Sequence, residues 1–333
     1  MSAGRAWVAG TGRWLPETVL TNAELGAAAG VDEEWILQRT GIHERRVADA
    51  DTGTAVMAAR AGSAALDAAG MPADRVELII VATSTPDHLT PPSACEVQAA
   101  LGSPAAACFD IEGGFAGWIY ALITAEGLIR AGTVRNALVV GADKLSTVTD
   151  RSDPNTGPLF GDGAGALVLT SDAGSHAVRA TSWWADGSLA DVLRRPSGGS
   201  RRPFDATVLE ERSHLLRMEG TRLFRPAVRV MAEQARRALA LAGVDVAEVG
   251  LIVPHQANLR IIQALTAELE LDPVRVFVNI ERYGNTGAAT VPIALHEALE
   301  TGAANGERPV LLVSFGAGAT AGAALLESGA GSA

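Results

Sequence analysis

The sequence is poor in cysteine, lysine and tyrosine, and it contains no long hydrophobic run. Its 333 residues include two cysteines and two tyrosines, and Lys144 is the only lysine. Cys95 and Cys108 both lie in apolar contexts, so we expect buried thiols rather than a disulfide framework. No apolar stretch is long enough to cross a bilayer, and the N-terminus lacks the hydrophobic region of a signal peptide. We therefore expect a cytoplasmic protein.

Positive charge is also scarce. There are 27 Lys and Arg residues against 38 Asp and Glu residues, which gives a net charge of −11 at pH 7. This balance argues against nucleic acid or an anionic membrane as a partner. The near absence of lysine beside abundant alanine is typical of a GC-rich genome and carries no functional meaning. With 48% hydrophobic residues, the chain has ample core for two domains or one large duplicated domain.

The most informative stretch is predicted to be a strand, a tight turn and a buried helix. An apolar run at 105–111 stops at Glu112, passes through the glycines at 113–114, and resumes as a helical pattern at 116–129. Small residues at the turn let the backbone bend sharply and let another segment approach closely. Phe115 then stands at a helix N-terminus, where an enzyme would place a nucleophile whose anion the helix dipole favours.

The chain repeats itself at one fixed offset, which indicates an internal duplication. The repeated segments are 78–81 and 251–253, 138–140 and 311–313, and 120–122 and 293–295. Each half alternates helices with buried strands, so we predict an α/β protein in which each half is a mainly parallel sheet with helices on both faces. Packed together, the halves 1–172 and 173–333 would form a five-layer αβαβα arrangement.

Catalytic groups in such a fold gather where the two halves meet at strand ends. Besides the turn at Phe115, two stretches end there. A buried strand stops at Pro254 and presents His255, and a further predicted strand-to-helix turn presents Asn285. A histidine alone would more simply be a hydrogen-bonded structural residue.

These stretches resemble the β-ketoacyl-ACP synthase III family of the thiolase superfamily. Residues 110–117 match its Asp-x-x-x-x-Cys-Ala-Gly pattern, except that Phe115 occupies the position of the nucleophilic cysteine. Pro-His-Gln-Ala-Asn at 254–258 and Gly-Asn-Thr-x-Ala-Ala at 284–289 match two further motifs. The resemblance covers nearly the whole chain and is weakest at 143–215. It implies the thiolase fold, a homodimer, and a role in fatty-acid or polyketide biosynthesis.

In that family, the cysteine takes an acyl group from acyl-CoA. Its histidine and asparagine then hold the thioester carbonyl of malonyl-acyl carrier protein while carbon dioxide leaves, and the carbanion attacks the acyl-cysteine. The resemblance thus implies that His255 and Asn285 are oxyanion donors. Backbone N–H groups at the elbow and in the loop of Phe315, Gly316 and Gly318 would hold the second oxyanion. Coenzyme A thioesters and acyl carrier protein are the implied partners, and no metal or other cofactor is implied.

The implied substrate entrance involves other residues. Trp35 and Arg39 match the family's Trp-Ile-x-x-Arg-Thr-Gly-Ile signature, which holds the coenzyme A nucleotide, and Asn258 joins them by resemblance. Trp35 offers a flat face for adenine, and Arg39 offers a planar cation. The arginine that the family places in the loop before Phe160 is displaced here, and Arg151 is the nearest candidate.

Carrier-protein docking is the last implied function. Arg222, Arg225 and Arg260 could supply local positive charge to an otherwise acidic protein, although Glu268 and Glu270 thin the basic patch.

Phe115 changes what this chain can do. Phenylalanine has no lone pair to attack a thioester, and its ring would fill the mouth of an acyl pocket. Cys95 lies in another predicted helix and Cys108 inside the strand before the turn, so neither replaces the missing thiol. We predict that the chain does not perform the two-step condensation. Three explanations stay open: a variant of an active enzyme, a homologue that decarboxylates malonyl thioesters or transfers acyl groups in secondary metabolism, and a non-catalytic partner of an active paralogue.

Overall fold

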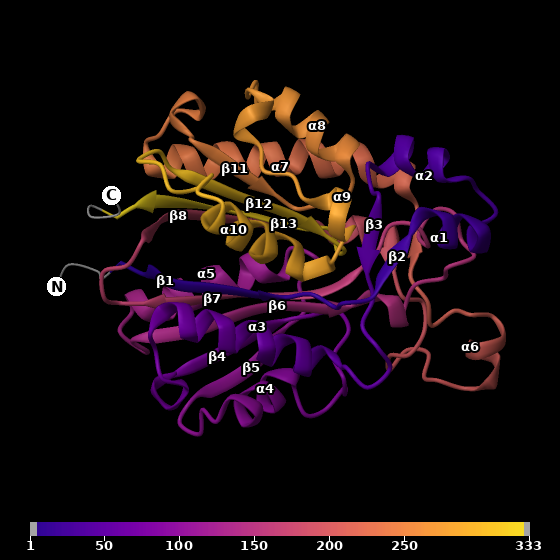
Figure 1. The fold of residues 1–333 in the computed structure, drawn as a ribbon, viewed down its shortest axis with the longest axis horizontal. Helices are drawn as coiled ribbons and strands as arrows, with labels where there is room; N and C mark the ends of the chain where they lie inside the picture. The colour runs from indigo at the N-terminus through magenta and orange to yellow at the C-terminus, as the bar shows by residue number, and fades with distance from the viewer. Residues whose placement is uncertain (1–4, 330–333) are drawn as a thin grey trace.

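The computed structural model describes residues 5–329, which form the five-layer αβαβα fold that the duplication predicts. In Figure 1, α3 and α4 cover one outer face, α7 and α8 cover the other, and α5 and α10 lie between the two sheets. The first sheet contains β1 (Trp7–Trp14), β4 (Leu78–Ala82), β5 (Ala107–Ile111), β6 (Asn136–Lys144) and β7 (Asp162–Thr170). The second contains β8 (His176–Ala185), β11 (Leu251–Pro254), β12 (Val310–Gly316) and β13 (Thr320–Ser328).

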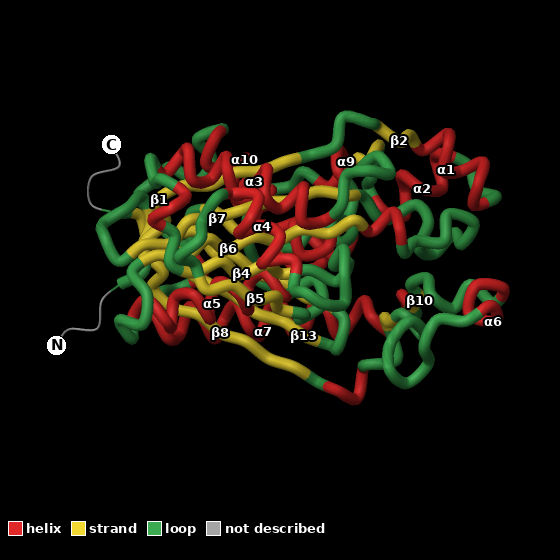
Figure 2. The backbone as a smooth tube through the Cα atoms, turned by 90° about the horizontal axis from the view of Figure 1, so that it is seen from below, coloured by secondary structure: helices red, strands yellow, loops and turns green. Residues whose placement is uncertain are grey.

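The helices of the five layers are α3 (Thr54–Ala69), α4 (Ser93–Leu101), α5 (Gly117–Arg130), α7 (Gly220–Ala242), α8 (Leu259–Glu268) and α10 (Thr290–Glu300). Two smaller lobes extend from one end of the molecule (Figure 2). They contain β2 (Val19–Thr21), α1 (Asn22–Ala29), α2 (Glu33–Thr40) and β3 (Glu44–Arg46) in one, and β9 (Leu193–Arg194), α6 (Ala206–Glu210) and β10 (Arg217–Met218) in the other. The short α9 (Ile280–Tyr283) precedes the turn that carries Asn285.

Apart from β5, which adds an outer strand beyond β4, the two sheets have the same strand order, β4-β6-β7-β1 in one and β11-β12-β13-β8 in the other. A two-residue pairing between β1 and β8 joins them into one continuous nine-stranded ladder. The prediction of mainly parallel sheets is wrong. Only β4–β5, β4–β6 and β11–β12 are parallel, and the other pairs are antiparallel. Loops without a crossover helix join β6 to β7 and β12 to β13, so each of these pairs runs antiparallel.

Glycines in the strands set how closely the helical layers pack. A Cβ on Gly12 of β1 would lie 2.4 Å from the backbone nitrogen of Ala65 in α3. A Cβ on Gly165 of β7 would lie 2.7 Å from that of Ile293 in α10. The glycine-rich run after Phe160 therefore serves backbone packing. The middle helices are buried on both sides by the two sheets, and Trp118 of α5 is 1% exposed.

Part of the stretch 143–215, where the resemblance is weakest, belongs to the core, because β8 begins at His176 and is central to the joined sheet. After Ala185 the chain leaves the sheets and returns to the five layers at α7. Among residues 5–329, no helix has both the length and the hydrophobicity that a membrane crossing requires.

Candidate active site

The predicted elbow brings Phe115 against His255, although the two residues come from different sheets. β5 ends at Ile111, and α5 begins two residues after Phe115. The Phe115 side chain is 6% exposed, and its ring centroid lies 5.8 Å from that of His255. A second 5.8 Å contact, in edge-to-face geometry, joins it to Phe160. Such aromatic contacts fix the orientation of a ring as well as burying it.

The end of β12 and the start of β13 lie against the elbow. The Ser314 hydroxyl donates to the Phe115 carbonyl oxygen (3.0 Å), and the Thr320 hydroxyl donates to that of Gly113 (2.6 Å). A Cβ on Gly316 would lie 2.3 Å from the Phe115 nitrogen, so only glycine lets these backbones meet. The predicted 315–318 loop thus lies directly against the elbow.

Phe315 and Gly318 occupy different surroundings within that loop. The Phe315 side chain is buried, and it lines a cavity of about 30 Å³ together with Phe115 and His255. Gly318 has a φ of 134°, in the region that favours glycine.

His255 is held as a neutral ring. The backbone N–H of His255 donates to the Val313 carbonyl (2.8 Å) where β11 ends. In the ring, Nδ1 lies 2.5 Å from the Thr290 hydroxyl oxygen. Burial lowers the pKa of His255 to about 3, so the ring is uncharged at neutral pH. When the Thr290 hydroxyl donates to Nδ1, the proton resides on Nε2. Within the described residues Nε2 has no hydrogen-bond partner, and it can donate to a ligand.

Asn285 is fixed by its backbone on both sides. Its N–H donates to the Leu159 carbonyl (2.9 Å), and its carbonyl accepts from the Gly161 N–H (3.0 Å). Its Oδ1 accepts from the Gly287 N–H (3.0 Å), while its side-chain NH₂ has no partner among residues 5–329. The backbone of Asn285 forms a single β-bridge with that of Phe160, whose ring contacts Phe115. The expected strand before it is wrong, because a short helix, α9, precedes this turn.

Three of the four predicted entrance residues lie together, and Arg151 lies apart from them. The Arg39 guanidinium lies 4.4 Å from the centroid of the Trp35 ring on α2, and the Asn258 side chain donates to the Arg39 carbonyl (2.9 Å). These three residues join α2 to the start of α8. Arg151 is exposed on the loop before β7, and no hydrogen bond or ion pair in the described chain links it to them.

The three candidate docking arginines differ in their ionic partners. Arg222 lies 3.3 Å from Asp191 and 3.1 Å from Glu219, so nearby carboxylates balance its charge. Arg225 and Arg260 are exposed near the starts of α7 and α8, and neither has an ion pair in the part of the chain described.

Comparisons with known proteins identify the family. A family model described as 3-oxoacyl-[acyl-carrier-protein] synthase III matches residues 109–187, and its C-terminal counterpart matches residues 239–328. The β-ketoacyl-[acyl-carrier-protein] synthase III of Aquifex aeolicus is 44% identical over 319 residues, covering 96% of this chain and 98% of that protein. The chain belongs to the 3-oxoacyl-[acyl-carrier-protein] synthase III family.

Solved synthase III structures share the whole fold. The crystal structure of the Aquifex aeolicus VF5 protein superposes with a TM-score of 0.89 at 43% identity, covering 97% of this chain and 99% of that one. The priming β-ketosynthase of the R1128 polyketide pathway gives a TM-score of 0.89 at 35% identity, covering 99% and 98% of the two chains.

A buried carboxylate that the sequence reasoning missed supports the Asn285 turn of this synthase III chain. Asp143 is fully buried and accepts hydrogen bonds from the hydroxyls of Thr83 and Thr85 (both 3.1 Å) and from the N–H groups of Ser84 and Ala288 (both 2.7 Å). Burial raises the pKa of Asp143 to about 7, although the hydrogen bonds oppose that shift. The sequence signal that could have revealed Asp143 is an acidic residue within the apolar pattern of β6.

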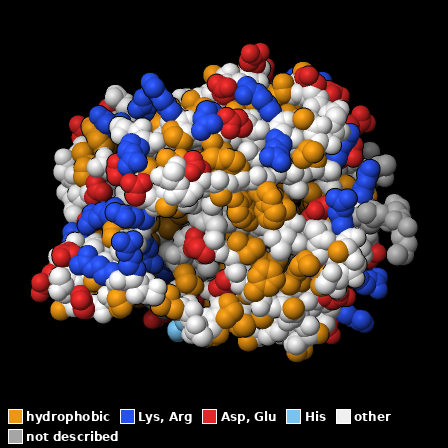
Figure 3. Space-filling model, turned by 180° about the vertical axis from the view of Figure 1, so that it is seen from behind, with side chains coloured by type: hydrophobic (Ala, Val, Ile, Leu, Met, Phe, Trp, Pro, Cys, Tyr) orange, Lys and Arg blue, Asp and Glu red, His pale blue; other side chains and the backbone are white. Residues whose placement is uncertain are grey.

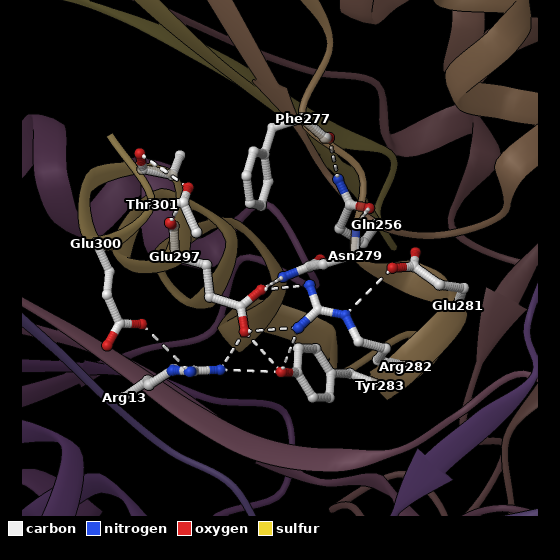
Figure 4. Close-up of polar contacts among 11 residues, drawn as sticks. Arg13, Gln256, Phe277, Asn279, Glu281, Arg282, Tyr283, Glu297, Glu300 and Thr301 are labelled. Carbon is white, nitrogen blue, oxygen red and sulfur yellow. Dashed lines mark hydrogen bonds and ion pairs between the residues drawn. The ribbon is translucent and has the colours of Figure 1, made fainter. Parts of the chain in front are cut away.

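A second buried carboxylate anchors α9 (Figure 4). Glu297 of α10 is 3% exposed and accepts hydrogen bonds from Arg13, Arg282, Tyr283 and Asn279. Burial alone would raise the pKa of Glu297, but the hydrogen bonds and the two guanidinium charges outweigh it and hold that pKa below its usual value. This network ties β1, α9 and α10 together next to the Asn285 turn.

We predict that Glu297→Ala lowers the free energy of unfolding by about 3 to 5 kcal/mol, because it leaves two guanidinium groups without their buried partner. Urea denaturation measures the change. Glu300→Ala is the matched control: Glu300 also pairs with Arg13, but its side chain is 59% exposed, so we expect a loss below about 1 kcal/mol. Equal losses in the two variants would contradict a structural role for the buried network.

His255 gives a prediction for pH dependence. Its folded pKa of about 3 lies below the ordinary value of 6.5, so between these values the unfolded chain binds the proton more tightly. The free energy of unfolding therefore falls as pH drops below about 6.5. Relative to His255→Gln, the wild-type protein should lose about 2 kcal/mol between pH 7 and pH 5. Urea denaturation at each pH measures this change. If the free energy of unfolding falls equally in the two proteins between pH 7 and pH 5, the ring titrates normally and the prediction is wrong.

Proposed function

We propose that this protein is an acyl-thioester enzyme of fatty-acid or polyketide biosynthesis that works without an acyl-cysteine intermediate. Its reaction is the decarboxylation of a malonyl thioester of coenzyme A or acyl carrier protein. The observations that carry this proposal are two neutral donors without partners in the described chain: His255 Nε2, whose ring packs on Phe115, and the Asn285 amide, whose backbone pairs with Phe160 next to Phe115. The names of the relatives indicate the same class of substrate.

The chemistry needs only these side chains. Both donors bind the thioester carbonyl oxygen, where negative charge develops as the bond to the carboxylate breaks and its electron pair forms the enolate. Carbon dioxide leaves, and a proton from water completes the acetyl thioester. The ring of Phe115 offers the carboxylate no hydrogen bond, and an apolar contact of this kind disfavours the ionised group relative to neutral carbon dioxide.

The cysteines support a reaction without a covalent intermediate. Cys95 lies in α4 and Cys108 in β5, and their sulfur atoms are 3.4 Å apart. Burial, together with the Cys95 thiol, raises the pKa of Cys108 to about 11, so it is protonated at neutral pH. Neither cysteine lines the cavity that Phe115 and His255 share.

We predict that the purified protein converts malonyl-CoA to acetyl-CoA while its intact mass stays unchanged. His255→Ala and Asn285→Ala should each lower kcat by about 100-fold, because each removes one oxyanion donor. Chromatography of the products and mass spectrometry of the protein measure the two effects. If the wild type and both variants release carbon dioxide from malonyl-CoA at equal rates, the reaction does not take place at this site.

Phe115→Cys separates the remaining explanations. If the chain is a variant of a condensing enzyme, this variant gains an acyl adduct from acyl-CoA, detected as a mass increase on the new thiol. If the wild type neither decarboxylates nor transfers acyl groups, and the substitution restores nothing, a non-catalytic partner of an active paralogue is the better description. An acyl adduct on wild-type Cys95 or Cys108 would contradict the proposal directly.

Substrate delivery follows from the entrance residues. We propose that coenzyme A places its adenine against Trp35 and its phosphates near Arg39, with Asn258 holding this wall to α8. Arg225 and Arg260 are the better candidates for docking an acidic carrier protein, since carboxylates already balance Arg222. The cytoplasm is the proposed compartment, where both substrates would be met.

We also propose that two copies of the chain pair through β5. The Ala107 N–H donates to the Glu77 carbonyl (2.9 Å), and the Ile111 carbonyl accepts from the Thr83 N–H (3.3 Å), both on the β4 side. Because backbone groups alternate in direction along a strand, those of Cys108 point to the open edge of the sheet. Exposed strand edges of this kind are templates for pairing. β5 extends toward the face drawn in Figure 3 (compare Figure 2), where hydrophobic side chains gather across the middle.

The pairing predicts that Cys108→Pro shifts the protein from dimer to monomer, because proline removes an outward N–H while leaving the ladder to β4 intact. Sedimentation velocity measures the assembly state. Cys108→Ala is the control that keeps the N–H group, and it should remain dimeric. A wild-type protein that is monomeric at micromolar concentration would rule out the pairing.

A further inference from the structure

The two cysteines of the chain lie against each other on the strand that leads to the elbow, and the proposed decarboxylation uses neither of them. Cys95 lies in the first turn of α4 and Cys108 is the second residue of β5, and their sulfur atoms are 3.4 Å apart. Both thiols are free, and both residues are partly exposed. Two thiols in contact need only a small further approach to form a disulfide bond, whose sulfur atoms are about 2 Å apart.

Hydrogen bonds on both sides of the cysteine pair hold α4 against β5. The carboxylate of Asp110 accepts from the backbone N–H groups of Ser93 (2.7 Å) and Ala94 (2.8 Å) at the start of α4. Farther along the helix, the Gln98 side chain donates to the Ala106 carbonyl (2.8 Å), just before β5 begins. On each element the cysteine lies between these two attachments. The contact between the sulfur atoms is therefore set by the placement of both elements, and not only by the rotamer of either thiol.

The cysteine pair lies on the face of the sheet that α4 covers (Figure 1). The Cys108 side chain packs against the apolar cluster that includes Ala94 and Val97 of α4. The proposed pairing between two chains uses backbone groups at the open edge of β5 instead. Thiol chemistry and chain pairing thus involve different sides of the strand.

We propose that Cys95 and Cys108 form a reversible disulfide when the protein meets a low-molecular-weight disulfide such as oxidised glutathione. Cys95 gives its proton to water, and its sulfur attacks the oxidant, whose S–S bond breaks to release one glutathione thiolate. The Cys108 sulfur then attacks the Cys95 sulfur of this mixed disulfide, its proton also passes to water, and the second glutathione thiolate leaves. Two protein thiols are oxidised by two electrons, and one glutathione disulfide is reduced to two thiols.

The protonation of Cys108 sets the order of the two steps. Burial, together with the Cys95 thiol and the Asp110 carboxylate, raises the pKa of Cys108 to about 11, so Cys95 is the thiol that reacts first. Once Cys95 is part of a mixed disulfide, its own contribution to that shift disappears. The two sulfur atoms are already in contact, and this proximity favours the second step.

The disulfide would fasten α4 to the strand that presents Phe115. β5 is the outer strand of its sheet and pairs with β4 alone among the strands that the structure describes. The bond would close the short loop 95–108 and so restrict the unfolded chain. We therefore expect oxidation to raise the midpoint of thermal unfolding by about 5 °C.

Oxidised glutathione, followed by N-ethylmaleimide to block the remaining thiols, tests the proposal on the wild-type protein. By intact mass, we expect a product that has lost two hydrogens and carries no N-ethylmaleimide, and dithiothreitol should restore both thiols. Cleavage after glutamate separates the cysteines, because Glu96 lies between them, so the bond is identified as a linked pair of peptides. Two blocked thiols, a glutathione adduct alone, or a disulfide between two chains would each overturn the proposal.

Cys95→Ala and Cys108→Ala are matched controls, since each leaves one thiol in the same environment. Neither should gain thermal stability from oxidised glutathione, and the adduct should form faster on Cys108→Ala, which retains Cys95. If either variant is stabilised as much as the wild type, or if oxidation lowers the unfolding midpoint of the wild type, the proposal fails. These assays require no turnover, so their outcome is independent of the decarboxylation assay.

Discussion

The contact between the phenyl ring of Phe115 and the imidazole of His255 is the constraint on which the rest of the site depends. The two rings belong to different halves of a duplicated fold, and each is presented as a strand of its own sheet ends. Their meeting requires the elbow to lie directly on the 314–320 loop, and Gly316 permits this because no side chain fits between the backbones. The position of a thiol in the resembled motif is thus filled by a ring that packs well but cannot react.

The surrounding structure keeps the two candidate donors neutral and oriented. Burial holds His255 uncharged, and Thr290 fixes its ring. The Asn285 turn is supported from one side by Asp143 and from the other by the network of Glu297. Burying carboxylates is costly unless each is hydrogen-bonded, and here both are bonded several times over. The proposed decarboxylation uses this combination, in which two candidate oxyanion donors are kept while Phe115 stands at the position of the nucleophile.

The sequence was most informative where local pattern and tertiary role coincide. The apolar run at 105–111 and the helical pattern at 116–129 are β5 and α5 within two residues, and the fixed offset of the repeats corresponds to the strand order that the sheets share. It failed on strand direction, because the loops after β6 and β12 carry no signal for an antiparallel return. It could not place Arg194 and Arg195 in the cavity that they line with Phe115, since only the fold brings these distant segments together. Asp143 was missed because only the three-dimensional structure brings its four donors together.

A crystal structure with a malonyl-CoA analogue in which a sulfonate replaces the carboxylate, so that no carbon dioxide can leave, tests the central claim most directly. We predict that the carbonyl oxygen of the analogue lies within hydrogen-bond distance of both His255 Nε2 and the Asn285 NH₂ group, with its sulfonate against the face of Phe115. An analogue bound with its carbonyl oxygen away from both donors would contradict the claim.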